Sequence, residues 1–180
     1  MRRSVRTLLE DEKAAVVTRS RKNKTIALDI PCRFDFQDFE EKSHQAIEAI
    51  KQGKPEEALE RASLALDLYQ GCFLDGMDEG WIDSTRSRLS ALFTQVQMVV
   101  ARVHLARGDF QQAESASREL IKLDDLREEA HVLLIESLAK VGRSAEAVAH
   151  YETAVELFEE EIGVTPESLR NALVELGLLL

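Results

Sequence analysis

A glycine followed five residues later by an alanine occurs three times in this chain. The second and third of these glycines lie 34 residues apart, and a fixed period of this length predicts helical hairpins that stack, because one hairpin cannot bury its apolar face alone. The first and second glycines lie 55 residues apart, which is one period plus 21 residues and predicts an insertion between the first two hairpins. The three pairs are Gly53 with Ala58, Gly108 with Ala113, and Gly142 with Ala147.

The 34-residue period is typical of the tetratricopeptide repeat. From Phe36 onward, apolar residues recur three and four positions apart, which is the spacing of one helical face. We therefore expect an all-α, tetratricopeptide-like stack of about seven helices, made of three hairpins and a C-terminal helix. Asp109 is expected to cap the helix that begins near Phe110. The expected helices span residues 36–52, 55–69, 81–107, 110–125, 127–141 and 145–161, and the last begins near residue 166.

The composition is that of a folded helical protein with one main domain. Hydrophobic residues make up 44% and charged residues 31% of the 180 residues, which argues against wholesale disorder. No apolar run reaches the roughly 18 residues that a membrane-spanning helix needs. Cys32 and Cys72 follow no metal-ligand spacing, and a helical core of this size needs no disulfide. We therefore expect a cytoplasmic protein.

The N-terminal segment differs from the rest in charge and in pattern. Residues 1–33 carry nine Lys/Arg against four Asp/Glu, whereas the remaining residues carry 14 against 29. Two β-prone runs, 15–19 and 25–28, flank a basic tip and predict a short β-hairpin. A basic arm on an acidic body could approach phosphate groups, and the alternative is a solvated charged arm. The basic residues in question are Arg2, Arg3, Arg6, Arg19, Arg21, Lys22 and Lys24.

The insertion carries an ordered run of motifs. Leu68-Tyr69-Gln70-Gly71-Cys72-Phe73-Leu74 is followed by Trp81 and then by Arg86-Ser87-Arg88-Leu89. Two later stretches, 123–131 and 161–166, fit the same pattern. Together, over about residues 34 to 170, this run resembles the bacterial transcriptional activator domain of regulators of the antibiotic-regulatory-protein (SARP) type.

The resemblance implies a fold, a function and a domain order. It implies a domain at 34–180 that mediates dimerisation or contacts RNA polymerase or another domain of the same regulator. It also implies that residues 1–33 are the end of a winged-helix DNA-binding domain, with 2–9 from its recognition helix and 16–28 from its wing. If that winged helix is complete, the seven basic residues named above are expected to contact DNA phosphates. The earlier elements of a winged helix have no counterpart here, so the chain is either a piece of a larger regulator or one that has lost the domain. The alternative function is a free-standing scaffold that binds a peptide or protein and has no DNA role.

Two sets of residues are candidates for a site or for a structural role. Tyr69, Gly71, Phe73, Leu74 and Trp81 are expected to pack the insertion onto the helices, although Trp81 could instead anchor a partner. Gly108, Ala113, Gly142 and Ala147 are expected to shape the hairpins, because small side chains let two helix axes approach. The concave face of the stack is expected to bind protein, unless the last helix fills it. That face is predicted to include Ile47, Met98, Arg102, Leu105, Val132 and Glu136.

The sequence carries no pattern typical of an enzyme. No phosphate-binding glycine loop and no nucleophile motif is present. The histidines fall on different expected helices without metal-ligand spacing, and we expect His131 to make a structural contact to the turn before it. We therefore expect no catalytic residue, no metal and no cofactor. The four histidines are His44, His104, His131 and His150.

Overall fold

The computed structural model describes residues 16–20, 25–29, 33–77 and 80–179. The chain divides into two compact units, Met1–Phe34 and Asp35–Leu180, and each is described here by itself. Of the seven basic residues predicted to contact DNA, six lie outside the described residues. These six are Arg2, Arg3, Arg6, Arg21, Lys22 and Lys24.

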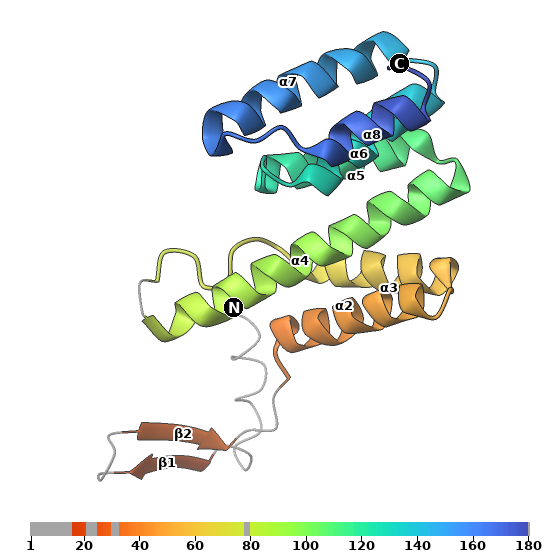
Figure 1. Ribbon diagram of the computed structural model, residues 1–180. Coiled ribbons are helices and arrows are strands. Elements are labelled where there is room, and N and C mark those ends of the chain that lie inside the picture. The colour runs from red at the N-terminus through yellow and green to blue at the C-terminus, as the bar shows by residue number, and fades with distance from the viewer. Residues whose placement is uncertain (1–15, 21–24, 30–32, 78–79, 180) are drawn as a thin grey trace. The chain divides into compact units, whose positions relative to one another are not determined.

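The described part of the first unit consists of two short strands. Strand β1 (Val16–Ser20) pairs antiparallel with β2 (Thr25–Asp29), so that Val16 lies opposite Asp29 and Ser20 lies opposite Thr25 (Figure 1). Val, Thr and Ile are frequent in both strands, and these β-branched residues favour extended backbone. Arg19, the seventh predicted DNA contact, lies in β1 opposite Ile26.

In the described part of the second unit, all regular secondary structure is helical. Figure 1 shows these helices stacked as successive hairpins. The hairpins pair α2 with α3, α4 with α5, and α6 with α7, and α8 packs against α6 and α7. The expected all-α, tetratricopeptide-like arrangement of the helical part is confirmed. The seven described helices are α2 (Asp35–Lys51), α3 (Pro55–Leu68), α4 (Gly80–Arg107), α5 (Phe110–Leu123), α6 (Glu128–Lys140), α7 (Ser144–Ile162) and α8 (Glu167–Glu175).

The two residues of the repeated pattern have different structural roles. Gly108 and Gly142 follow the first helices of their hairpins with φ of +84° and +82°, a conformation that costs L side chains energy. Five residues later, Ala113 and Ala147 are completely buried where the second helix meets its neighbours. The glycine therefore reverses the chain, and the alanine lets the two helices pack closely.

The long helix α4 connects the first hairpin to the rest of the stack. It packs against α2 and α3 on one side and against α5 and α6 on the other. Among the described residues it is the one helix long and apolar enough to cross a membrane by length and composition, yet 44% of its apolar window is buried inside the protein. One such helix is weak evidence of a membrane span, because the core helix of a soluble protein passes the same test.

Within the described residues, the hydrophobic core follows the stack as four clusters of buried side chains, and the last of them includes α8. Phe39 of α2, Leu89 and Val96 of α4 are buried between the first hairpin and α4. At the other end, Phe158 of α7 and Leu173 of α8 are buried with residues of α6. Helix α8 therefore covers the apolar surface that the last hairpin would otherwise expose.

The predicted cap of α5 is wrong. Asp109 occupies the N-cap position, but its side chain makes no capping hydrogen bond. Its carboxylate instead lies 3.3 Å from His104 Nδ1 and 3.3 Å from Arg107 Nε. These donors at the end of α4 compete for the oxygen that the amide groups of α5 would otherwise use.

Candidate protein-interaction groove

Two adjoining hollows lie along α2, α4 and α6. The first, of about 330 Å³, lies between α2, α4 and the start of α6, and Ile47, Met98 and Arg102 are among its lining residues. The second, of about 470 Å³, lies between α4 and α6, where Arg102 is joined by Leu105, Val132 and Glu136. All six residues predicted for the concave face therefore line these hollows. We call the two hollows together the groove.

Helical spacing explains why these side chains share one surface. Met98, Arg102 and Leu105 are four and three residues apart on α4, and Val132 and Glu136 are four apart on α6. Residues at such intervals lie above one another on one helix face. Because α4 packs against both α2 and α6, its exposed face is continuous with theirs.

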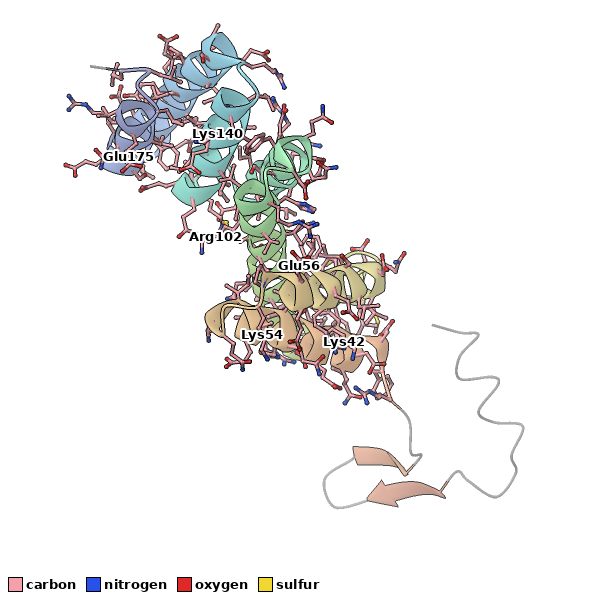
Figure 2. All side chains as sticks on the ribbon, turned by 90° about the vertical axis from the view of Figure 1, so that its right-hand side faces the viewer. Lys42, Lys54, Glu56, Arg102, Lys140 and Glu175 are labelled. Carbon is pink, nitrogen blue, oxygen red and sulfur yellow. The ribbon has the colours of Figure 1, made fainter. Side chains whose placement is uncertain are left out.

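An ion pair links the two hollows. Arg102 Nη2 lies 3.3 Å from Glu129 Oε1, and both residues line both hollows. Figure 2 shows Arg102 on α4, between the first hairpin and the helices that carry Lys140 and Glu175. The two side chains are 56% and 59% exposed, so the pair contributes about 1 kcal/mol or less to stability. It can therefore open for a ligand at little cost.

The last helix does not fill the groove, so the alternative of a self-occupied face is wrong. Helix α8 buries Leu169 and Leu173 against α6 and α7. Among the described residues of α8, Ser168 alone lines a hollow, and its hydroxyl donates a hydrogen bond of 2.6 Å to Glu128 Oε2. Helix α8 therefore borders the second hollow and leaves both hollows open.

The surroundings of Glu136 change the pKa of its carboxyl group. Its pKa is raised mainly by burial and also by the nearby Glu175, while Lys140 acts in the opposite direction. A cation placed in the second hollow would reverse part of this effect, because it would stabilise the charged carboxylate.

The insertion packs onto the first hairpin, as predicted for Tyr69 and Phe73. The Tyr69 ring stacks on Phe93 at 4.1 Å between centroids and lies 5.2 Å from the Phe39 ring. Phe73 meets Phe36 edge to face at 5.3 Å. These contacts connect the loop to α2 and α4 through aromatic rings.

The loop of the insertion also has unusual backbone. Gly71 has φ of +127° and Leu74 has φ of +50°, and Leu74 is partly buried. Trp81 belongs to α4, but its side chain lies outside the described residues, so its packing role stays a prediction.

Arg86 holds the insertion in place, a role that the sequence analysis missed. Its guanidinium group donates hydrogen bonds to the carbonyl oxygens of Phe73, Leu74 and Met77, at 3.3, 3.1 and 3.2 Å. The Arg-x-Arg-Leu motif was the sequence signal that could have indicated this role of Arg86. The second arginine of the motif, Arg88, forms an ion pair with Glu40 of α2. Since loop carbonyls lack helical partners, one arginine can satisfy several of them.

A histidine pair, in which His131 is buried and His150 is partly buried, is a second missed feature. His131 Nδ1 lies 3.1 Å from His150 Nε2, and the two rings stack with centroids 5.1 Å apart. His131 Nε2 lies 2.8 Å from the carbonyl oxygen of Asp125, which confirms the predicted contact to the preceding turn. Because a carbonyl only accepts, His131 donates from Nε2 and accepts at Nδ1 from His150.

Burial decides the charge of His150. Its pKa falls to about 4, mainly because the ring is largely buried and also because His131 and Arg118 are close. His150 is thus neutral at pH 7. Within the described residues, no group of three or more His, Cys, Asp or Glu side chains could hold a metal ion. Nothing in the spacing of residues on two separate helices signalled that these rings would meet.

Comparison with known proteins identifies the class of the helical unit. The family model described as "Bacterial transcriptional activator domain" matches residues 34–175. The chain therefore belongs to the bacterial transcriptional activator domain family. It contains a regulatory domain of a bacterial transcriptional activator, and this domain is not an enzyme.

Particular relatives agree with this membership. The regulatory protein AfsR of Streptomyces coelicolor is 33% identical over 102 residues, which are 57% of this chain and 10% of AfsR. A structure of Mycobacterium tuberculosis EmbR in complex with a low affinity phosphopeptide is similar with a TM-score of 0.74 and 20% identity, over 89% of this chain and 43% of that one. This chain therefore spans only a small part of AfsR and less than half of EmbR.

Tetratricopeptide domains with no regulatory name share the same fold. The C-terminal domain of a putative FK506-binding protein of Plasmodium falciparum has a TM-score of 0.61 at 16% identity, over 79% of this chain and 88% of that domain. The Arabidopsis OM64 domain has a TM-score of 0.57 at 16% identity, over 80% of this chain and 98% of that domain. At such identities the likeness concerns the fold alone.

Proposed function

We propose that the helical domain, residues 34–180, binds a segment of a protein partner in the groove. The partner is a second copy of the regulator, RNA polymerase or another domain of the same regulator. The observation that carries this proposal is the placement of apolar side chains from three helices along two open hollows joined by an exposed ion pair. Apolar surface that remains hollow and open gains stability when a partner covers it.

The size of the groove fits a short helix or strand. Along α4 its lining extends from Thr94 to Ala106, which at the rise of a helix is on the order of 18 Å. A partner helix of about twelve residues has the same length. Met98, Leu105 and Val132 would contact its apolar face.

The N-terminal segment, in this proposal, supplies the link to DNA. Residues 1–33 are the end of a winged-helix domain, in which 2–9 close the recognition helix and 16–28 form the wing. Its basic side chains contact phosphates, while the acidic helical domain stays away from DNA. The protein acts in the cytoplasm, where the chromosome is.

Binding of a partner is tested by charge placed in the groove. Leu105→Glu and Val132→Glu each put a carboxylate on the lining, and Leu64→Glu, on the exposed face of α3 outside both hollows, is the matched control. Self-association is measured by analytical ultracentrifugation, and binding to purified RNA polymerase by surface plasmon resonance. We expect both groove variants to lose at least one interaction about tenfold, and the control to keep it. Unchanged binding in both groove variants, with normal circular dichroism, would contradict the proposal.

DNA contact is tested by the salt dependence of the DNA-binding constant. Seven phosphate contacts predict that log K for a 30-base-pair duplex falls with log salt with a slope of about −6. Replacing Arg19, Arg21, Lys22 and Lys24 by Gln should reduce that slope by about four. Binding that ignores salt, or no binding by a chain that includes its natural upstream sequence, would favour the free-standing scaffold.

A further inference from the structure

The two hollows of the groove carry opposite charge. The first is lined by Lys51, Arg102 and Arg127 with the single carboxylate of Glu129. The second is lined by Glu128, Glu129 and Glu136 with the single cation of Arg102. Since Arg102 and Glu129 pair with each other, the remaining side chains make the first hollow positive and the second hollow negative.

The cations of the first hollow are available to a ligand. Lys51, at the end of α2, forms no ion pair within the described parts of the chain. Arg127 Nη2 lies 2.9 Å from Asp124 Oδ2, but Arg127 Nε is buried and has no acceptor. A carboxylate in this hollow would find the ammonium group of Lys51, with the guanidinium group of Arg127, held by Asp124, beside it.

The anions of the second hollow are only partly compensated, because Arg102 pairs with Glu129 and the effect of Lys140 on Glu136 is smaller than that of Glu175. Glu128 accepts only the hydroxyl of Ser168 among the described residues. Glu136 is half-buried, with Glu175 close enough to oppose its ionisation. A lysine or arginine side chain of a ligand would relieve this repulsion, because it would lie between carboxylates.

We propose that the groove selects an amphipathic protein segment with an acidic side chain at one end of its apolar stretch and a basic side chain at the other. The acidic end lies over the first hollow and the basic end over the second. This inference rests on the proposed function, because it specifies the segment that the groove binds. Charge complementarity of this kind fixes the direction of a bound segment and excludes segments of uniform charge.

Four labelled helical peptides with one apolar centre test the inference. They carry Glu at the N-terminal end and Lys at the C-terminal end, the reverse arrangement, Glu at both ends, or Lys at both ends. Affinities are measured by fluorescence anisotropy on the full chain, with peptide helicity measured by circular dichroism. We expect one of the bipolar peptides to bind about tenfold more tightly than either uniform peptide, and this preference to shrink in high salt.

Charge reversals in the protein should change the preference in opposite ways. Lys51→Glu cancels the positive charge of the first hollow, where Arg127 remains, so the bipolar peptide should lose its advantage over the peptide with Lys at both ends. Glu136→Lys cancels the negative charge of the second hollow, where Glu128 remains, so the bipolar peptide should lose its advantage over the peptide with Glu at both ends. Lys42→Glu and Glu60→Lys change the net charge equally and lie outside both hollows, so the bipolar peptide stays preferred.

The outcomes separate this inference from the proposed function. If all four peptides bind equally and Val132→Glu abolishes their binding, the groove binds protein without reading charge, and the inference is wrong. If no peptide binds and the groove variants keep their partner interactions, both are wrong. If the two reversals change the preference no more than their controls do, the charges of the hollows have no role in selection.

Discussion

The repeated hairpins and the insertion are stabilised in different ways. In the hairpins, alanines with no exposed surface, such as Ala58, Ala113 and Ala147, allow close contact between regular helices. In the insertion, aromatic rings and the three carbonyl hydrogen bonds of Arg86 hold irregular backbone. The backbone groups of a helix form hydrogen bonds with one another, so helices need only side chains that fit together. Loop carbonyls need side-chain donors in addition to apolar contacts. The predictions below test this difference.

The largest effect is expected for a bulky side chain in a hairpin. Ala113→Phe places a ring where α5 meets its neighbours with no free space, and should lower the free energy of unfolding by about 3 kcal/mol. Urea denaturation measures the change, and Gln112→Phe on the exposed face of α5 is the control. Similar stabilities for the two variants would mean that close packing at the repeated alanine is not what holds the hairpin.

Loss of the guanidinium group should destabilise the insertion. Arg86→Met removes the guanidinium donor from three loop carbonyls, of which Leu74 keeps the N–H of Met77, and should cost about 2 kcal/mol. Arg86→Lys should recover only part of this loss, because one ammonium group cannot reproduce the guanidinium geometry. Hydrogen exchange of residues 70–77 should increase in Arg86→Met and remain unchanged in Arg170→Met, at an exposed position on α8. If exchange increases equally in both, Arg86 has no special role.

The histidine pair makes the third hairpin sensitive to acid. The pKa of His150 is about 4 in the folded chain and 6.5 in the unfolded one, so the unfolded chain binds more protons between these values. Stability from this group is complete above pH 6.5 and is lost as the pH falls toward 4. With allowance for solvent screening of a partly exposed ring, the loss is about 2 kcal/mol.

Substitution at the pair checks the origin of this acid sensitivity. His150→Gln keeps a donor for His131 but does not titrate, so its stability should vary less between pH 7 and pH 4.5. His44→Gln, at an exposed position on α2, should leave the pH dependence as it is. An equal pH dependence in the wild type and in His150→Gln would assign the acid sensitivity to other groups.

The smallest effect is expected at a turn glycine. Gly142→Ala forces a side chain into a backbone with φ of +82° and should cost about 1 kcal/mol. Gly80→Ala, at the first residue of α4 with open space around it, should be neutral or slightly stabilising. Thermal unfolding compares the two. A neutral Gly142→Ala would show that the turn tolerates other conformations.

Local pattern was sufficient for most of the helices and for the family. The period of the glycine and alanine pairs, helical spacing and the motifs of the insertion depend on neighbouring residues, so they are readable in one dimension. The six groove residues were also predictable, because residues at four and three positions apart share a helix face wherever the helix lies. Asp109 was mispredicted because a capping rule ignores the competing side-chain donors at the end of the preceding helix.

What the sequence by itself determined is the helical repeat, the position of the insertion and the membership in the activator domain family. The tertiary structure decided which side chains meet across helices: His131 with His150, Arg86 with the loop carbonyls, and Arg102 with Glu129 between two oppositely charged hollows. These contacts join residues on separate elements, and their geometry follows from how the helices pack. No rule of local spacing contains that information.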